Sequence, residues 1–392
     1  MSYVKGSLAS SSITGLKPDV SSELSLLDVN RYPLVALLTN FGKDPVLGTG
    51  KSMKKESCGN HKFEWYEKEY AAVADAINNG AGYAASAVSV VVDNGAYFNL
   101  NDIVLVPRTS ERVQVTDIST DTLTITRSIG TTAAAALVDD EPLFIIGNAF
   151  GQSSDSATAS YLQKSAKYNY TQIFKKSIDL SGTHEAETTY TGKTRDEERV
   201  IKGVEHMVDI ERAFMFGERG SGTDKDGKEC YYTGGVIEKI TTNIQNESSS
   251  TLTEDEFESF LGDYAFKYGS LSKYMFASSV IISAINKFAR NDLETVPGEK
   301  VFGVQIKKYL SPHGELMLIK EPLFTGTIYG GFAVVLDMKE LTYKYLQSRD
   351  TQYQKNIQTK GNDSYKDQYL TECGLKMKLE KASAILKGCI AS

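Results

Sequence analysis

The segment Gly48-Thr49-Gly50-Lys51-Ser52 contains the residue types of a phosphate-binding loop. In such a loop the pattern GxxxxGK[ST] joins a buried strand to a helix, because glycines let backbone amides surround the phosphates and the helix N-terminus faces them. Pro45 occupies the first glycine position here, and proline has a fixed φ and no amide hydrogen. The flanking segments show neither a buried strand nor an apolar helical stripe. The sequence therefore disfavours a P-loop NTPase that uses Lys51.

Asp337 follows the apolar run Phe332–Leu336, which is where the magnesium-binding acid of such an enzyme would stand. Without a phosphate-binding loop, this acid has no partner for that chemistry. We expect Phe332–Leu336 to form a core strand, and Asp337 to stand at the turn that ends it.

The segment Asp224-Lys225-Asp226-Gly227 resembles half of a calcium-binding loop. If Asp224 and Asp226 were the third and fifth positions of that loop, Gly222 would be the first and Thr233 the last, and neither carries a carboxylate. We expect a glycine-rich hairpin turn instead.

The histidines and cysteines show no spacing typical of metal ligands or nucleophiles. They are His61, His184, His206 and His313, and Cys58, Cys230, Cys373 and Cys389. We expect reduced thiols, and a solvated or interface position for His206 beside Glu205. The acidic runs at 196–198 and 254–256 stand where helices are expected to begin, so the helix dipole explains them. We therefore assign no catalytic, cofactor-binding or metal-binding residue.

The composition of the 392 residues is that of a soluble globular protein, with 41% hydrophobic and 24% charged residues. A net charge of −7 disfavours a protein that grips nucleic acid across a broad face, because such proteins need excess Lys and Arg. No apolar run approaches the roughly 18 to 20 residues that cross a bilayer, and no secretory signal is visible, so synthesis in a cytoplasm is expected. The 22 tyrosines suit surfaces buried against a partner, although compositional drift explains them equally well.

The elements that must position these residues begin with an arm over residues 1–62, which has one apolar segment at 33–38. The small residues of 71–87 indicate a linker or extended loop. Four short strand signals then predict a small β-barrel or sandwich: Ile103–Val106, Arg112–Val115, Leu123–Thr126 and Leu143–Ile146.

A long helix is predicted from a capping box at Thr194 and Glu197 to a stop at Gly217. A second capping box at Thr253 and Glu256 opens a helix to about Tyr268. Another helix at 278–290 follows, with strands at 301–309, 315–320 and 332–336. Near the chain end, Leu375, Met377 and Leu379 alternate with charged residues, which predicts a long half-buried strand. The fold class is α+β.

The order of these features resembles the major capsid (major head) proteins of tailed bacteriophages, which have the Hong Kong 97 fold. The resemblance is carried by Phe63-Glu64-Trp65, by 169–174 and 177–183, by 197–217, by Thr233-Gly234-Gly235-Val236, by 273–288, and by 371–375 with 384–388. No one of these segments is specific, but their order along the chain is.

The resemblance implies the following domains. Residues 1–62 would be the N-terminal arm, 63–175 an extended E-loop carrying a β insertion at about 95–150, 176–233 a P-domain with a spine helix at about 195–217, 234–346 an A-domain, and 347–392 a return to the P-domain with a long C-terminal strand.

The function implied is that of a structural, non-enzymatic subunit that self-assembles into pentamers and hexamers of an icosahedral shell around double-stranded DNA. The expected partners are other copies of the chain, a scaffolding protein, a portal and decoration proteins, with no sequence-specific DNA contact and no membrane. Assembly would take place in the cytoplasm of the host bacterium, and the mature location would be the virion. The alternatives are an encapsulin-like nanocompartment shell, the disfavoured P-loop NTPase, and a tail or baseplate protein, which fits the β insertion but not the long helix.

Overall fold

The computed structural model describes residues 32–39, 54–187, 194–292, 300–301, 304–305 and 307–390. The chain divides into two compact units, one of residues 1–65 with 167–392 and one of residues 66–166. Val46–Met53, the segment with the features of a phosphate-binding loop, lies outside the described residues.

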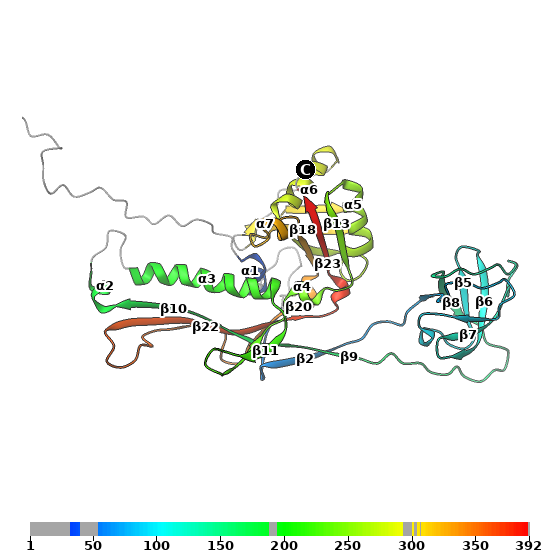
Figure 1. The fold of residues 1–392 in the computed structure, drawn as a ribbon, viewed down its shortest axis with the longest axis horizontal. Coiled ribbons are helices and arrows are strands. Elements are labelled where there is room, and N and C mark those ends of the chain that lie inside the picture. The colour runs from blue at the N-terminus through cyan, green and yellow to red at the C-terminus, as the bar shows by residue number, and fades with distance from the viewer. Residues whose placement is uncertain are drawn as a thin grey trace, which may run out of the picture. The chain divides into compact units, whose positions relative to one another are not determined.

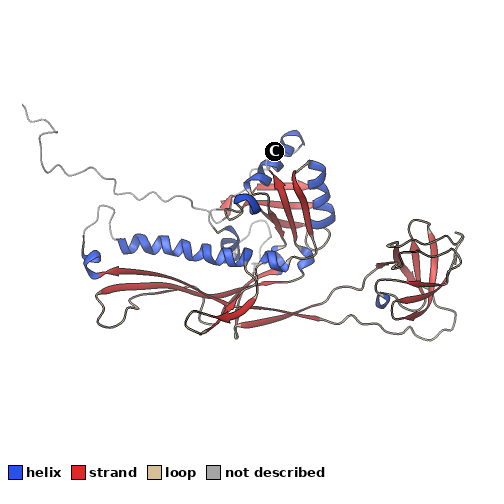
Figure 2. Ribbon diagram, in the orientation of Figure 1, coloured by secondary structure: helices blue, strands red, loops and turns tan. Residues whose placement is uncertain are grey.

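A sheet of long strands runs beside the longest helix of the described part of the first unit (Figures 1 and 2). Its order is β1-β20-β22-β10, with β21 also paired to β22. The strands are β1 (Lys54–Cys58), β20 (Leu341–Leu346), β22 (Ser364–Met377), β10 (Gln172–Ser181) and β21 (Gln352–Gln354). β10 and β22 pair antiparallel from Gln172 opposite Cys373 to Ser181 opposite Ser364.

The helix α3 (Thr194–Phe216) confirms the predicted long helix. Its apolar stripe packs on the sheet through Ile210, Phe214 and Met215, which are fully buried. The helix ends where two backbones touch: a Cβ on Gly217 would lie 2.4 Å from the carbonyl oxygen of Ala213 and 2.5 Å from that of Thr233. Only glycine fits this close approach, so Gly217 sets the end of the helix.

The helix α1 (Pro33–Thr39) forms from the apolar segment of the predicted arm. Leu34, Leu37 and Leu38 are at most 1% exposed and belong to the same apolar cluster as Phe214 of α3. This part of the arm is therefore a core element of the first unit.

A six-stranded mixed sheet forms the other half of the first unit, in the order β13-β23-β19-β14-β18-β17. Its strands are β13 (Ile244–Thr251), β23 (Ala384–Ile390), β19 (Ala333–Leu336), β14 (Ser272–Ala277), β18 (Gly314–Lys320) and β17 (Lys307–Ser311). The helical elements of this half are α4 (Val236–Lys239), α5 (Glu254–Phe260), a π-helical turn at Leu261–Ala265, α6 (Ser279–Asp292) and α7 (Gly326–Tyr329). The predicted capping box is confirmed, with Thr253 and Glu256 bonded reciprocally.

The end of the chain differs from the predicted alternation. Leu375 and Met377 are buried in β22 as expected, but Leu379 is 39% exposed and has a left-handed backbone with φ of 46°. This conformation ends the strand, and after a 3-10 turn at Glu380–Ala382 the chain forms β23, which pairs with β13 and β19. The prediction failed at Leu379 because alternation alone does not reveal a backbone reversal.

The remaining short elements of the first unit include a hairpin and an extended stem. The hairpin strands β11 (Gly220–Thr223) and β12 (Glu229–Tyr232) confirm the predicted glycine-rich turn. The stem pairs β2 (Lys62–Glu67) with β9 (Ser165–Tyr170). The others are α2 (Gly182–Ala186) and the pair β15 (Lys300–Val301) and β16 (Val304–Gln305).

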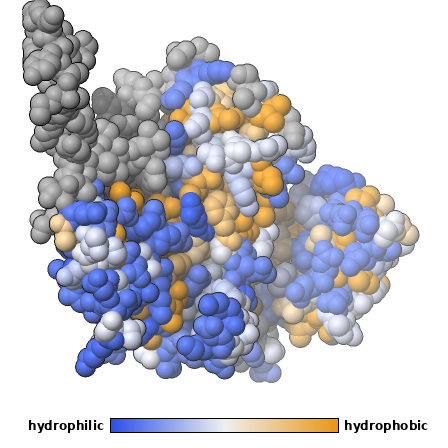
Figure 3. Space-filling view, turned by 60° about the vertical axis from the view of Figure 1, so that its left-hand side comes forward, coloured by the Kyte–Doolittle hydropathy of each residue, from blue (hydrophilic) through white to orange (hydrophobic). Residues whose placement is uncertain are grey.

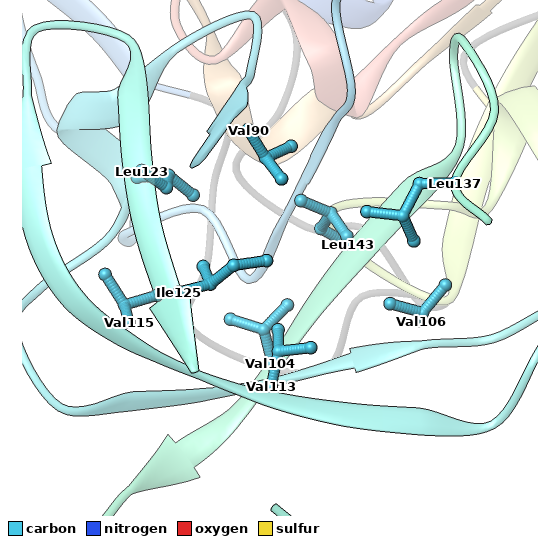
Figure 4. A pocket seen from close by; sticks show the side chains of 9 residues that line it. All are labelled: Val90, Val104, Val106, Val113, Val115, Leu123, Ile125, Leu137 and Leu143. Carbon is cyan, nitrogen blue, oxygen red and sulfur yellow. The ribbon is translucent and has the colours of Figure 1, made fainter. Parts of the chain in front are cut away.

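The second unit is a six-stranded antiparallel sheet in the order β3-β8-β5-β6-β7-β4. Its strands are β3 (Ala74–Ala76), β4 (Ser89–Val91), β5 (Asp102–Val106), β6 (Glu111–Ser119), β7 (Thr122–Thr126) and β8 (Pro142–Asn148), with a 3-10 turn at Gly95–Tyr97. All four predicted strands are confirmed. Their apolar side chains, such as Val104, Val113 and Leu143, converge on one interior (Figure 4).

The segment 71–87, predicted to be a linker or loop, instead contains a strand of this sheet. Ala74 pairs with Phe144, and Ile77 is fully buried in the core. The sequence did not indicate this strand because its residues are small. A strand at the edge of a sheet needs few bulky side chains when the neighbouring strand provides the apolar ones. The β unit accordingly begins before residue 95.

Candidate assembly elements

Asn169, at the end of the stem strand β9, is the most heavily bonded side chain of the buried polar groups near the stem. Its Nδ2 donates to the carbonyl oxygens of Gly234 at 2.9 Å and Leu375 at 2.7 Å, and to Thr233 Oγ1 at 3.3 Å. Its Oδ1 accepts the amides of Gly234 at 2.8 Å and Tyr170 at 2.9 Å. Three segments that the sequence showed only as separate features therefore meet at one fully buried amide.

The side chains of Asn169 and Thr233 form the backbone hydrogen bonds that a neighbouring strand would otherwise form with β22. The pairing of β10 with β22 reaches Cys373, and two residues later the Leu375 amide donates to Thr233 Oγ1 while its carbonyl accepts from Asn169. A buried strand edge without partners would be costly, so these side chains let β22 continue beyond β10.

A row of polar bonds continues along β22. Thr171 donates to Glu372 at 3.2 Å, and Glu372 forms an ion pair with Arg349. On α3, His206 Nε2 lies 2.7 Å from Thr371 Oγ1, and the imidazole stacks on Tyr369 at 5.9 Å. These contacts join the stem, the long helix and the sheet through a single strand.

The expectation of a solvated or interface position for His206 is wrong. The imidazole is fully buried, and this burial lowers its pKa to about 4. It is therefore neutral near pH 7 and packs as a polar core residue. A helical histidine on the same face as Met207 and Ile210 cannot be distinguished from an exposed one by sequence spacing alone.

An aromatic cluster fixes the β11–β12 hairpin to the stem. The rings of His61 and Tyr231 stack at 4.3 Å, and Tyr170 lies 5.2 Å from Tyr231. Tyr168 continues the cluster and carries the Arg219 guanidinium 4.1 Å above its ring. Some of the 22 tyrosines thus make contacts within the chain.

Asp337 ends a core strand at a turn, as predicted. Its carboxylate accepts the amides of Ser270 at 2.8 Å and Lys339 at 3.2 Å, and it is 2% exposed. The neighbouring Lys273 is fully buried, donates to three carbonyl oxygens, and has a pKa that burial lowers to about 8. Both charged groups are used to hold turns.

In the candidate calcium segment, a carboxylate accepts hydrogen bonds from backbone amides of the same turn. Asp224 Oδ1 accepts the amides of Asp226 at 2.9 Å and Lys228 at 2.8 Å, and Gly227 takes a positive φ of 75°. Within the described ranges, no cluster of His, Cys, Asp and Glu could hold a metal ion. The same ranges contain no helix long and apolar enough to span a membrane. All four cysteines are free thiols.

The net negative charge of the chain comes from the second unit. Residues 66–166 contain twelve Asp and Glu against five Lys and Arg, so their excess equals the full net charge of −7. Two of the five cations are held in ion pairs with buried acids, Arg127 with Glu111 and Arg108 with Glu141. The exposed surface is accordingly acidic.

The surface of the second unit is interrupted by exposed apolar side chains, and hydrophobic residues lie among hydrophilic ones on its visible face (Figure 3). Val73, Phe144 and Ile146 are 68%, 42% and 53% exposed. Single exposed apolar residues are ordinary, but these three lie on or beside the same strand, β8.

A long helix beside a long-stranded sheet, a second α+β half, and an extended stem leading to a separate unit define a structural capsid subunit of the Hong Kong 97 fold. Within the described residues, Asp224, Lys273 and Asp337 form hydrogen bonds with the backbone. The chain belongs to the family of the SU10 major capsid protein, whose model matches residues 6–389. It is therefore a phage major capsid protein, and its copies build the capsid shell of the virion.

The chain is also similar to individual proteins and solved structures. The chain is 24% identical over 282 residues to the major capsid protein of Pseudomonas phage PaMx41, covering 68% of this chain and 67% of the relative. Among solved structures, that of Microbacterium phage Oxtober96 aligns with a TM-score of 0.46 and 8% identity over 95% of this chain and 96% of the other. The SrpI encapsulin of Synechococcus elongatus aligns with a TM-score of 0.42 and 10% identity over 57% and 76%.

Proposed function

We propose that copies of this chain form the pentamers and hexamers of an icosahedral head that encloses the double-stranded DNA of a tailed bacteriophage. The observation that carries the proposal is the family match across residues 6–389, nearly the whole chain. It favours the phage over the nanocompartment alternative. Assembly would take place in the cytoplasm of the bacterial host, before the particle is released.

In this proposal, each part of the chain has its own role in assembly. Residues 1–62 act as the arm and 63–175 as the extended loop with its β insertion. Residues 176–233 and 347–392 form the peripheral domain, and 234–346 the axial domain. Two features support this division. The hydrogen bonds of Asn169 attach the stem to β22, and the aromatic cluster attaches the β11–β12 hairpin to the stem.

The chain acts without catalysis, cofactor or metal in this proposal. The buried charged groups Asp337 and Lys273 support it, since their hydrogen bonds are taken by the backbone. Nucleotide hydrolysis by the purified protein that disappears in a Lys51→Ala variant would contradict it.

The remaining partners are a scaffolding protein, a portal, decoration proteins and the packaged DNA, which is enclosed without sequence-specific contact. The acidic second unit supports this last point, because like charge keeps it from the phosphate backbone. We therefore propose that residues 66–166 lie on the outside of the shell or between subunits, away from the DNA.

The test is assembly of the purified full-length chain, alone and with the scaffolding protein encoded beside it in the phage genome. Electron microscopy and sedimentation should show closed shells, capsomers or tubes. A chain that stays monomeric in every condition, including with the scaffolding protein, would refute the proposal.

Cross-linking of shells built from equal amounts of ¹⁴N- and ¹⁵N-labelled chains tests the role of the extended loop. We expect mixed-isotope amine cross-links from Lys68 or Lys164, the two lysines of the second unit, to a neighbouring copy. The matched control is a Lys68→Arg, Lys164→Arg chain, which keeps the charge but lacks reactive amines. Cross-links confined to one isotope would show that the loop stays on its own subunit.

A further inference from the structure

Two carboxyl groups from different elements meet in the core of the first unit. Glu211, on α3, is fully buried, and Glu321, directly after β18, is 1% exposed. The two side chains are neighbours, and each influences the pKa of the other. Neither takes part in the contacts of the stem described above.

Glu211 holds the first turn of α1. Its Oε1 accepts the amide of Leu34 at 2.8 Å and its Oε2 that of Val35 at 2.6 Å. The first turn of a helix offers its amide donors to side-chain acceptors, and Glu211 accepts from two of them here. The α1 segment is therefore attached by a carboxyl group as well as by its buried leucines.

Glu321 is less completely bonded. Its Oε1 accepts the amide of Leu323 at 3.1 Å, whereas its Oε2 is buried without a hydrogen-bond donor from the described residues. A proton shared between the two carboxyl groups would add a hydrogen bond at this buried site. The burial of both acids and the unbonded oxygen together favour a protonated pair.

Among the described residues, no cation pairs with either acid. Lys320, directly before Glu321, is exposed, and the segments Pro33–Thr39 and Pro322–Tyr329 contain no charged residue. On α3, Asp209 and Arg212 are partly exposed and pair with each other, and Asp209 also pairs with Lys176. The other ionisable groups of the apolar cluster are phenols and a thiol: Tyr32, Tyr274, Tyr329, Tyr343, Tyr345 and Cys373.

Burial without a paired cation disfavours charge on either acid, and the neighbouring Glu321 further disfavours charge on Glu211. The pKa of Glu211 lies well above its ordinary value, and burial raises the pKa of Glu321 to about 7. The pair therefore keeps at least one proton at neutral pH, and it titrates as a unit.

We propose that the proton shared by Glu211 and Glu321 is a latch that holds α1 in the core, and that losing this proton loosens α1. Loss of the proton leaves two adjacent uncompensated negative charges under the helix. They are relieved when water reaches them, and α1, a short helix attached over Glu211, is the element whose opening admits water. The first part of the N-terminal arm would thus respond to pH within a single subunit.

The test is hydrogen exchange of the unassembled full-length chain between about pH 6 and pH 9, with rates corrected for the intrinsic effect of pH. Because one proton is lost per opening, the protection of the Ala36–Leu38 amides should fall about tenfold per pH unit above about pH 7. The β22 amides provide the internal reference, and their protection should not follow this slope. A flat profile for α1, or an equal slope in β22, would overturn the proposal.

Further variants sharpen the result. Glu321→Gln keeps a polar group facing Glu211 but removes one of the two acids, so the remaining buried acid should leave only a weakened pH dependence of α1 protection. The double variant Glu211→Gln, Glu321→Gln cannot ionise at either position, so its α1 protection should become independent of pH. It should also be lower at every pH, because one backbone amide loses its acceptor. Glu205→Gln, on the same helix but only partly buried, should keep the wild-type profile. A wild-type slope in the double variant would refute the latch, and if that variant does not fold, an undiminished slope in Glu321→Gln would refute it.

Discussion

Replacing Asn169 by alanine should be among the most damaging single changes near the stem. The substitution removes hydrogen bonds to three buried backbone groups: the amide and the carbonyl of Gly234, and the carbonyl of Leu375. Each bond contributes about 1 kcal/mol net, and each partner left unsatisfied costs about 1 to 3 kcal/mol. We expect a loss of about 3 to 6 kcal/mol, which is a large share of the 5 to 15 kcal/mol that stabilises an ordinary domain.

The measurement is urea unfolding of the unassembled chain, followed by circular dichroism. The matched control is Asn362→Ala, an exposed asparagine on a turn, which should change the unfolding free energy by less than about 0.5 kcal/mol. A loss below about 1 kcal/mol for Asn169→Ala would show that water replaces the amide, and it would refute the role of Asn169 as a substitute for a strand partner.

Asn169→Asp separates hydrogen bonding from packing, because aspartate has the same shape. Its carboxylate would face the carbonyl oxygens of Gly234 and Leu375, to which it cannot donate. Burial and these oxygens should raise its pKa in the folded state, so the lost stability should return as the pH falls and the carboxyl gains a proton. Equal instability at pH 4.5 and pH 8, values chosen to bracket about that transition, would contradict this explanation.

Three further predictions concern neighbouring contacts. Gly235→Ala should cost about 1 to 3 kcal/mol in the same unfolding assay, because its Cβ would lie 2.8 Å from the carbonyl oxygen of Phe214. Asp367 is buried, but its bonds to Arg195 and other donors outweigh that burial and hold its pKa at about 2. Its contribution to stability should therefore be present above about pH 4 and lost as the pH falls toward 2. Asp367→Asn should abolish this acid-dependent loss. Tyr231→Ala should expose the hairpin to limited proteolysis at 224–228 and cost about 0.5 to 1.5 kcal/mol per lost ring contact.

Local signals predicted the local elements correctly. The capping box at Thr253, the apolar stripe of α3 and the glycine-rich turn at Gly227 each depend on residues within one or two turns of chain, so the sequence contains their full cause. The same holds for the strands of the second unit, whose alternation records one buried face. Asp337 was placed correctly because an acid after an apolar run commonly caps a turn.

The contacts that assemble these elements could not be predicted in the same way. Asn169 meets Leu375, and Glu211 meets both Val35 and Glu321, across more than a hundred residues of chain. No periodicity relates such positions, because their juxtaposition is a consequence of the fold. The polar character of each residue was visible, but its partner was not, and for this reason His206 was expected at the surface.

The distant contacts converge on β22. Asn169 of the stem and Thr171, directly after it, bond to its residues 375 and 372, and His206 of the long helix bonds to residue 371. Since β22 also pairs with β10 and β20, a displacement of the stem must distort either buried hydrogen bonds or the central strand of the sheet. Proteins resist such distortion because a buried polar group without its partner is costly. If the extended loop contacts a neighbouring subunit, as we propose, this anchoring would transmit force on the loop to the sheet of the first unit.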